Sequence, residues 1–206
     1  MSPRAGGPPA PSGRLPRHGR QRSSAGRVVL GVTGSIAAYK SAEIVRGLVK
    51  AGAGVRCVLT PNGGRFITPL TLATLSNNPV AQDPFDRSLW DMAHVSLASW
   101  ADLILVAPAT ADFMARLAGG RAETLLDTLV LASRCPVAVC PALHENMWTH
   151  RATQRNVELL KGYGYAVWGP GKGALASGGT GWGRLLDPDE IVSRALGLCR
   201  GKKRPA

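Results

Sequence analysis

The sequence predicts an α/β protein built on a single doubly wound, mostly parallel sheet with helices on both faces. Short apolar runs that look like strands alternate along the chain with stretches of helical periodicity. These runs are almost continuously apolar, as expected for strands that are covered on both faces. Glycine-containing and polar segments follow directly after several of them, at the edge where open α/β sheets bind ligands.

The length and composition fit one folded domain between two basic tails. A chain of 206 residues with 45% hydrophobic residues is long enough to bury a sizeable core. We expect a disordered tail over residues 1–26, the folded domain over 27–198 and a short C-terminal tail over 199–206. Both tails carry basic residues and no acidic ones, so most of the formal net charge of +12 lies outside the domain. We therefore expect no nucleic-acid partner, with a loose tail contact to RNA or acidic lipid as the alternative.

The first half of the domain begins with two strand and helix pairs. The expected elements are, in order, a strand over 27–32, a helix over 36–50, a strand over 55–60 and a short helix over 68–76. β-Branched apolar runs predict the strands, and apolar residues at helical spacing predict the first helix, which ends at Gly52 and Gly54. Residues 77–93 look irregular, and residues 94–100 fit either a helix or a strand.

The second half continues the alternation. The expected elements are strands over 103–107, 137–140 and 165–168, and helices over 111–118, 123–133, 153–162 and 188–198. The last helix starts with a proline followed by acidic residues, which is typical of a helix N-terminus. The glycine-rich segment 169–183 predicts a long flexible loop.

Three segments that each follow a strand would meet at the carboxyl edge of the sheet. They are residues 34–38, 107–112 and 141–148, and the last of them combines polar, histidine and aromatic side chains. Because ligands bind at this edge in open α/β sheets, the three loops predict a cofactor site.

Gly34 and Ser35, between a strand and a helix, form a candidate phosphate site. A helix N-terminus presents free N–H groups to an anion, although a plain helix cap would use the same residues. The GxGxxG dinucleotide motif is absent, and Tyr39-Lys40-Ser41 stands where a P-loop needs Gly-Lys-Ser. The sequence therefore argues against a nucleotide triphosphatase.

The cysteines and the apolar runs indicate in which cellular compartment the protein works. No pair among Cys57, Cys135, Cys140 and Cys199 has CxxC spacing, so we expect no metal site and no disulfide, which fits a cytoplasmic protein. No apolar run reaches the roughly 18 residues that a membrane span needs, and no secretory signal is present. We expect no membrane partner.

The spacing of residues along the chain does not by itself identify the catalytic residues. A lone histidine such as His94 or His144 is more often structural than catalytic, and no GxSxG, HExxH or paired-carboxylate arrangement is present. The loop 169–183, with Lys172 and Arg184, could close over an anionic ligand or be an ordinary surface loop.

Several motifs in order resemble the flavin-containing cysteine decarboxylases, over nearly the whole folded domain. They are Gly34-Ser35-Ile36-Ala37-Ala38-Tyr39-Lys40, His94 before Trp100-Ala101-Asp102, Ala107-Pro108-Ala109-Thr110-Ala111-Asp112, Pro141-Ala142-Leu143-His144-Glu145-Asn146-Met147-Trp148, and Ala176-Ser177-Gly178 before Gly181-Trp182-Gly183-Arg184. The resemblance implies a flavodoxin-like or Rossmann-like flavoprotein that binds FMN. It also implies homo-oligomers, as trimers or dodecamers, with the site at a subunit interface.

The family's site residues carry over by motif position. Those implied to hold FMN are Gly34, Ser35 and Ile36 at the phosphate, Thr60, Asn62 and Phe66 on the next loop, Thr110, Ala111, Asp112 and Phe113 at the ribityl chain or ring, and Cys140 nearby. Those implied to bind substrate are Ala142, Leu143, His144, Met147, Lys172, Ala176, Ser177 and Arg184. The implied catalytic residues are His94, His144 and Ser177, with His94 acting beside the flavin of a neighbouring subunit.

The implied reaction explains why a flavin is needed. Oxidation of a cysteine thiol to a thioaldehyde places the carboxylate β to a C=S group, so that carbon dioxide can leave and an enethiolate remains. In the coenzyme A members, reduced FMN then reduces the enethiol to the final thiol. His94 would be the acid/base of the thiol step. The resemblance is strongest to the members that convert 4′-phosphopantothenoylcysteine to 4′-phosphopantetheine in coenzyme A biosynthesis, which are carboxy-lyases. We expect this chain to be the decarboxylase without the synthetase to which bacterial members are usually fused.

Two departures from the family pattern leave alternatives open. His144 stands where the family has an Asn that grips the substrate carboxylate, and a histidine can also donate a hydrogen bond. Ser177 stands where the family has a Cys that protonates the reduced product, and a hydroxyl is a far weaker acid than a thiol. A peptidyl-cysteine decarboxylase of ribosomal peptide maturation, which skips that reduction, is therefore one alternative. A non-catalytic regulatory flavoprotein subunit is the other.

Overall fold

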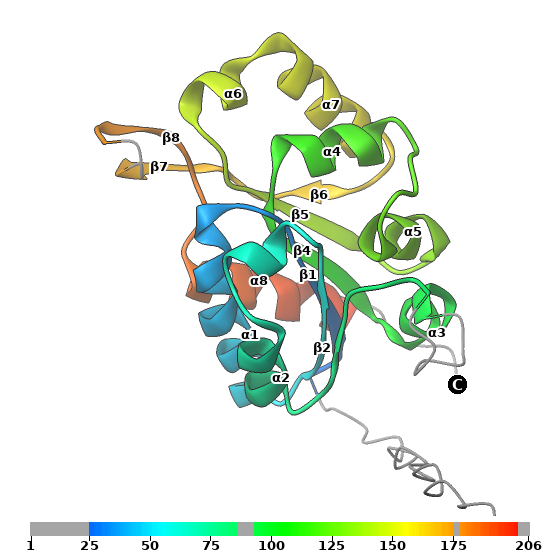
Figure 1. Ribbon diagram of the computed structural model, residues 1–206. Coiled ribbons are helices and arrows are strands. Elements are labelled where there is room, and N and C mark those ends of the chain that lie inside the picture. Colours follow the sequence, from blue (N-terminus) through cyan, green and yellow to red (C-terminus); the bar gives the residue numbers. More distant parts are fainter. Residues whose placement is uncertain (1–24, 86–92, 175–177, 202–206) are drawn as a thin grey trace, which may run out of the picture.

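The computed structural model describes residues 25–85, 93–174 and 178–201, and most of both expected tails lies outside this range. In the described part of the chain, six parallel strands form one sheet in the order β3-β2-β1-β4-β5-β6 (Figure 1). The strands are β1 (Arg27–Val32), β2 (Gly54–Leu59), β3 (Val80–Ala81), β4 (Leu103–Ala109), β5 (Val137–Pro141) and β6 (Ala166–Val167). This is the strand order of the Rossmann fold, with the direction of winding reversing between β1 and β4. The predicted doubly wound sheet is confirmed.

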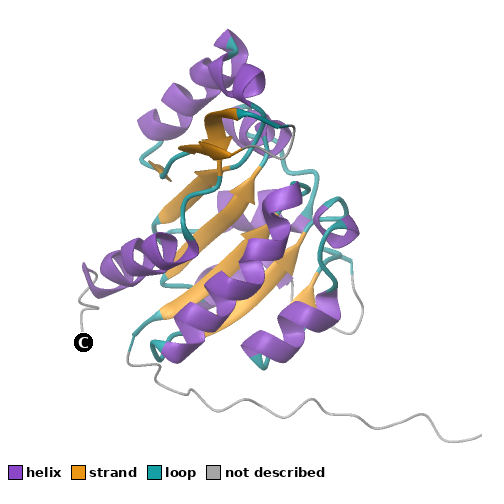
Figure 2. Cartoon of the chain, turned by 90° about the vertical axis from the view of Figure 1, so that its left-hand side faces the viewer, coloured by secondary structure: helices purple, strands orange, loops and turns teal. Residues whose placement is uncertain are grey.

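Helices cover both faces of the sheet, as Figure 2 shows. One face packs against α1 (Ser41–Lys50), α2 (Pro69–Ser76) and α8 (Pro188–Gly201). The other packs against α3 (Ala93–Trp100), α4 (Ala111–Ala118), α5 (Leu125–Ala132) and α7 (Arg151–Gly162). Each face has its own hydrophobic core, so the sheet is buried on both sides and its strands need no polar positions.

Successive side chains of β1 point alternately into the two cores. Val28 and Leu30 point into the core beneath α1 and α8, whereas Val29 points into the core beneath α3, α4 and α5. Gly31 is the smallest residue of this strand because Leu126 of α5 lies directly on it. A Cβ at position 31 would come within 2.5 Å of the Leu126 Cδ1 atom.

The structure corrects the sequence prediction most clearly at residues 169–183. The predicted flexible loop was wrong, because this segment contains β7 (Gly171–Ala174), which pairs with β8 (Thr180–Arg184) in an antiparallel hairpin. The glycines that suggested a loop instead allow the hairpin to approach neighbouring groups closely: a Cβ at Gly183 would overlap the carbonyl oxygen of Leu143. The connecting residues 175–177 lie outside the described residues.

Smaller differences concern element types. The ambiguous residues 94–100 belong to helix α3, and the first helix begins as a 3-10 turn, η1 (Ile36–Lys40), before α1. β3 and the short helix α6 (Glu145–Thr149) were not predicted from the sequence. Both are too short to produce a periodic pattern.

Candidate functional site

A pocket of about 710 Å³ opens at the carboxyl edge of the sheet, over the point where the winding reverses between β1 and β4. Its walls come from the three predicted loops and from the hairpin. The lining residues are Gly34, Ser35, Ile36, Ala37, Tyr39 and Lys40 after β1, Thr110 and Ala111 after β4, Ala142, Leu143, His144 and Met147 after β5, and Ala174, Gly183, Arg184 and Leu185 from the hairpin and the residue after it.

The wall that follows β1 is built around a helix start. Ser35 is the N-cap of η1, and its hydroxyl accepts from the Ala37 N–H at 3.3 Å and donates to the Ala142 carbonyl at 3.2 Å. Gly34 is required here because the loop after β2 lies against it, and a Cβ at position 34 would sit 2.5 Å from the Cβ of Asn62. The backbone N–H groups of this start are suited to an anionic group.

Buried hydroxyls tie the loops after β1 and β4 together. The Thr33 hydroxyl donates to the Pro108 carbonyl at 2.8 Å and accepts from the Thr110 N–H at 3.1 Å. The Ser41 hydroxyl donates to the Ala107 carbonyl at 2.9 Å. Sequence reasoning missed Thr33 and Ser41, although both stand inside or next to the motif that begins at Gly34. These bonds fix the floor of the pocket.

His144 lies at the wall formed after β5. Its ring is the N-cap of α6, with Nδ1 accepting from the Asn146 N–H at 3.2 Å. A ring nitrogen that accepts a hydrogen bond carries no proton, so in the neutral ring the proton is on Nε2. His144 therefore has one hydrogen-bond donor left for a ligand.

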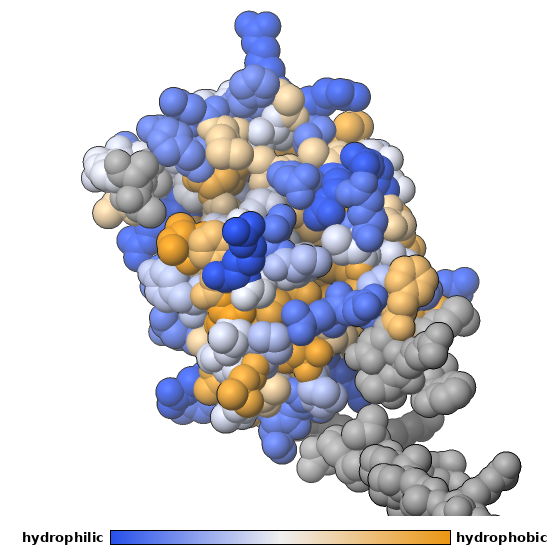
Figure 3. Space-filling model, in the orientation of Figure 1, coloured by the Kyte–Doolittle hydropathy of each residue, from blue (hydrophilic) through white to orange (hydrophobic). Residues whose placement is uncertain are grey.

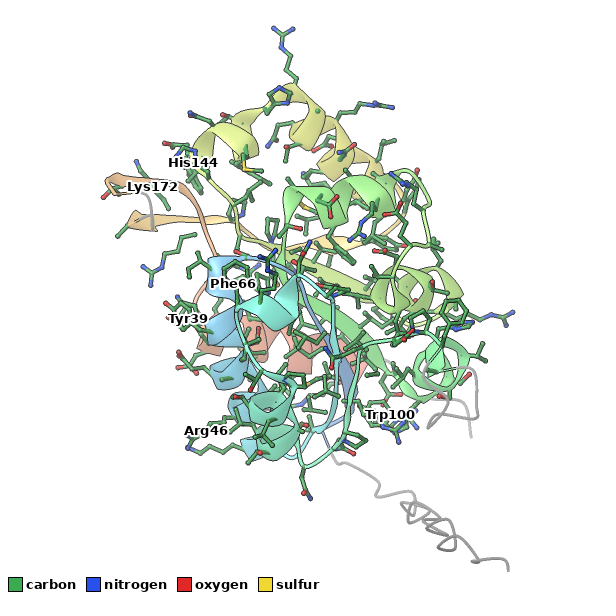
Figure 4. The ribbon with its side chains drawn as sticks, in the orientation of Figure 1. Tyr39, Arg46, Phe66, Trp100, His144 and Lys172 are labelled. Atoms are coloured by element: carbon green, nitrogen blue, oxygen red, sulfur yellow. The ribbon has the colours of Figure 1, made fainter. Side chains whose placement is uncertain are left out.

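Two cationic side chains line the pocket, Lys40 from η1 and Arg184 from β8. Within the described ranges neither forms an ion pair with a carboxylate, although several other arginines do. Lys172, on the exposed β7 strand, lies on the same side of the molecule as His144 but not among the lining residues (Figure 4). The pocket therefore favours a ligand with negative charge.

The other residues implied by the resemblance lie around the pocket rather than in its lining. Thr60 is buried and shapes the turn after β2, with its hydroxyl donating to the Val32 carbonyl at 3.2 Å. Asn62 and Phe66 are exposed on the same turn, which contains η2 (Gly63–Arg65). Figure 4 shows Phe66 on the same side as Tyr39.

Three more of the implied cofactor residues belong to α4 and β5. Asp112 is exposed and pairs with Arg116 one turn along the helix, at 3.4 Å. Phe113 and Cys140 are fully buried in the two cores, and burial raises the pKa of the Cys140 thiol. The two substrate residues Ala176 and Ser177 lie outside the described residues.

His94 lies away from the pocket. It is in the first turn of α3, which packs against α5 on the far side of the molecule from the hairpin (Figure 1). Its Nδ1 atom is buried and has no hydrogen-bond partner among the described residues. One chain therefore does not bring His94 and the pocket together.

The parts of the chain described by the structure hold no group of three or more His, Cys, Asp or Glu side chains that could bind a metal ion. Nor does any helix within the described ranges have both the length and the apolar character to cross a membrane.

The fold and the pocket define a Rossmann-type protein with an anion-favouring ligand site at its topological switch point. Comparison with known proteins then specifies the family. A family model described as "Flavoprotein" matches residues 17–199, so the chain belongs to the flavoprotein family. A flavin is thus the class of cofactor to which its fold is adapted, and the resemblance to the flavin-containing cysteine decarboxylases is confirmed.

Curated relatives agree with this family. The Coenzyme A biosynthesis bifunctional protein CoaBC of Vibrio cholerae is 47% identical over 168 residues, which cover 81% of this chain and 42% of the relative. CoaBC of Escherichia coli strain K12 is 47% identical over 171 residues, covering 82% and 42%. The chain thus spans less than half the length of the curated relatives that it matches.

Solved structures show the same fold. A Cys-to-Ser mutant of PPC decarboxylase, complexed with pantothenoylaminoethenethiol, superposes with a TM-score of 0.76 at 29% identity, covering 86% of this chain and 99% of that chain. The FMN binding protein AtHal3 gives 0.76 at 28% identity, covering 87% and 100%. The FMN-dependent cysteine decarboxylase SpaF gives 0.74 at 30% identity, covering 84% and 97%.

Proposed function

We propose that the protein is an FMN-dependent carboxy-lyase that converts 4′-phosphopantothenoylcysteine to 4′-phosphopantetheine. The observation that carries this proposal is the pocket at the switch point, in which a helix start and two cations, neither paired with a carboxylate of the described residues, face apolar walls. The 47% identity to CoaBC and the likeness to a PPC decarboxylase with a TM-score of 0.76 support the choice of substrate.

The residues present fit FMN. Gly34 and Ser35 supply the close backbone approach and the N–H groups that a phosphate needs. Apolar side chains such as Ile36 and Met147 line the pocket and suit the faces of a planar ring. When bound, FMN would supply the acceptor for two electrons that leave the substrate sulfur and, once reduced, the donor that returns them to the enethiol.

The chain's own residues would then orient the substrate. His144, through Nε2–H, and Arg184 would hold its carboxylate and its phosphate. Held in this way, the carboxylate would have a fixed orientation beside the carbon that carries the sulfur, which favours loss of carbon dioxide. His94 would move the thiol proton.

A homo-oligomer, as a trimer or dodecamer, would supply that histidine from a second copy. Exposed apolar side chains of the segments after β1 and β2 support such an assembly: Ile36 and Tyr39, which line the pocket, and Phe66 and Leu70 are 59%, 56%, 46% and 76% exposed. Figure 3 shows hydrophobic surface over this side of the molecule. Burying such side chains against a second copy would be favourable.

The test is direct. Purified protein should be yellow, and incubation with 4′-phosphopantothenoylcysteine should release carbon dioxide and give 4′-phosphopantetheine by mass spectrometry. A product lighter by one hydrogen molecule would mean that the enethiol is released unreduced. A colourless protein that takes up no FMN when offered it would overturn the proposal.

A peptidyl-cysteine decarboxylase is the second candidate, because Ser177 replaces the Cys that protonates the reduced product and SpaF shares the fold at 30% identity. A peptide ending in Cys distinguishes the two. Turnover of that peptide without turnover of 4′-phosphopantothenoylcysteine would favour this second candidate.

A further inference from the structure

The hairpin is attached to α6 at two adjacent points. The Leu143 N–H donates to the Gly183 carbonyl at 3.0 Å, which joins the two backbones. One step further, the Glu145 carboxylate accepts from the Trp182 N–H, with Oε1 at 3.0 Å. Trp182 is in β8 and Glu145 is the first residue of α6, so this second bond joins the strand directly to the helix.

The glycines of β8 make room for this carboxylate. A Cβ at Gly181 would lie 2.7 Å from Glu145 Cδ, and its three nearest heavy atoms all belong to the Glu145 carboxyl group. Gly181 has no positive φ, so a side chain at this position would not strain the backbone but would have to displace the Glu145 carboxylate. The Glu145 side chain thus occupies the volume that any side chain at position 181 would need.

Glu145 is an acidic residue in the first turn of α6, which suits a helix N-terminus, but the only hydrogen bond to its carboxylate in the described structure comes from Trp182. His144, not Glu145, caps α6, and no lysine or arginine of the described ranges pairs with the Glu145 carboxylate. Glu145 is half-buried and is not one of the pocket's lining residues. A negative charge near a pocket that favours anions would weaken ligand binding. The presence of Glu145 there therefore indicates a structural use.

Both ends of this contact are next to residues that line the pocket. His144 and Met147 flank Glu145 on one side, and Gly183 and Arg184 follow Trp182 on the other. The contact therefore fixes how far Arg184 stands from His144 across the pocket mouth.

We propose that Glu145 is a positioning residue, which fastens β8 to α6 through the Trp182 N–H and so holds Arg184 in the pocket wall. The effect of Glu145 on turnover rests on the proposed function. The attachment of β8 to α6 does not rest on it, and the attachment and the effect on turnover are tested separately.

The first experiment measures hydrogen–deuterium exchange at the Trp182 amide of the purified full chain. Glu145→Ala should speed exchange roughly tenfold, since it removes a hydrogen bond to a charged acceptor, whereas Glu145→Gln keeps an acceptor oxygen and should stay close to wild type. Glu158→Ala is the matched control, because Glu158 is an exposed acid that pairs with Lys161 on α7. Unchanged exchange in Glu145→Ala would overturn the proposal.

A second experiment uses the close contact between Gly181 and the Glu145 carboxylate, which occupies the space that a side chain at position 181 would need. Gly181→Ala should displace the carboxylate and speed exchange at Trp182 in the wild-type background, but should add little in the Glu145→Ala background. Equal effects of Gly181→Ala in both backgrounds would show that the two residues act independently and would contradict the proposal.

Kinetics then separate this inference from the proposed function. With 4′-phosphopantothenoylcysteine, Glu145→Ala should raise KM roughly tenfold and change kcat less, because it loosens Arg184 rather than a reacting group. If the wild type does not turn over this substrate but exchange changes as expected, the proposed function fails and the attachment stands. A fall in kcat with unchanged KM and unchanged exchange would refute the positioning role.

Discussion

At the scale of single residues, the site is defined by side chains with two simultaneous partners. His144 is the clearest case: Nδ1 caps α6 and leaves Nε2–H for a ligand. The sequence alone shows that a histidine replaces an asparagine, but not which ring nitrogen is available. Only the N-cap geometry makes that assignment, because it identifies Nδ1 as the acceptor.

This geometry predicts a contrast between two substitutions. His144→Asn and His144→Asp should both cap α6, since both residues are good N-caps, but only Asn offers a donor to the substrate carboxylate. We expect kcat/KM for 4′-phosphopantothenoylcysteine to stay near wild type in His144→Asn and to fall about 100-fold in His144→Asp. Thermal unfolding of both variants checks that the fold is kept. Similar activities would show that His144 serves only as a cap.

At the scale of elements, the strands and most helices could be predicted because each has a local signal. β1 and β4 are continuous apolar runs, and helix α5 starts with a capping box from Thr124 to Asp127. The hairpin could not be predicted in this way. Its glycines resemble a loop in sequence, but Gly181 and Gly183 lie against Glu145 and Leu143, which are distant in the chain.

The start of η1 gives a prediction at this scale. Gly34→Ala should push the loop at Asn62 away from the helix start and weaken FMN binding by at least tenfold, with the fold retained. Gly64→Ala is the control, because the nearest atom to a Cβ there is 3.7 Å away. Titration of each apoprotein with FMN, followed by flavin fluorescence, measures the difference. Equal affinities would show that the phosphate does not bind at this helix start.

At the scale of the whole molecule, the pocket and His94 lie on different sides of one chain. The motifs pointed to both, but sequence order carries no information on which residues of one copy face another. The location of His94 on α3, with an unpartnered buried Nδ1, became clear only from the fold.

A mixing experiment tests the shared site. His94→Asn and His144→Asp should each be nearly inactive alone. When the two are unfolded together and refolded, activity should return, because some sites then combine an intact pocket from one copy with an intact His94 from another. Failure to recover any activity, with mixed oligomers confirmed by native mass spectrometry, would contradict a site built from two copies.

The buried thiols predict how the whole domain responds to alkali. Burial, partly offset by a hydrogen bond with Ser76, raises the pKa of the Cys57 thiol from its ordinary value of 9.0 to about 12. Below pH 9 the thiol is protonated in both states, so it adds no pH dependence. Above pH 9 the unfolded chain ionises and the folded one does not, so stability falls by up to about 1.4 kcal/mol per pH unit until pH 12.

Chemical denaturation at several pH values measures this effect. The decline in the free energy of unfolding between pH 9 and 10.5 should be smaller in Cys57→Ala than in wild type, whatever the absolute stabilities. Parallel curves for the two proteins would show that Cys57 ionises equally in both states.

The base and the outer boundary of the pocket are held by different kinds of contact, and the hydroxyl of Thr33 is part of the first. Because it grips the strand end at Pro108 and the turn at Thr110 together, the base of the cavity is anchored within the sheet. The outer boundary depends instead on a few bonds between a hairpin and a one-turn helix. We therefore expect small molecules to enter and leave the cavity at that outer boundary, while the base of the cavity moves little.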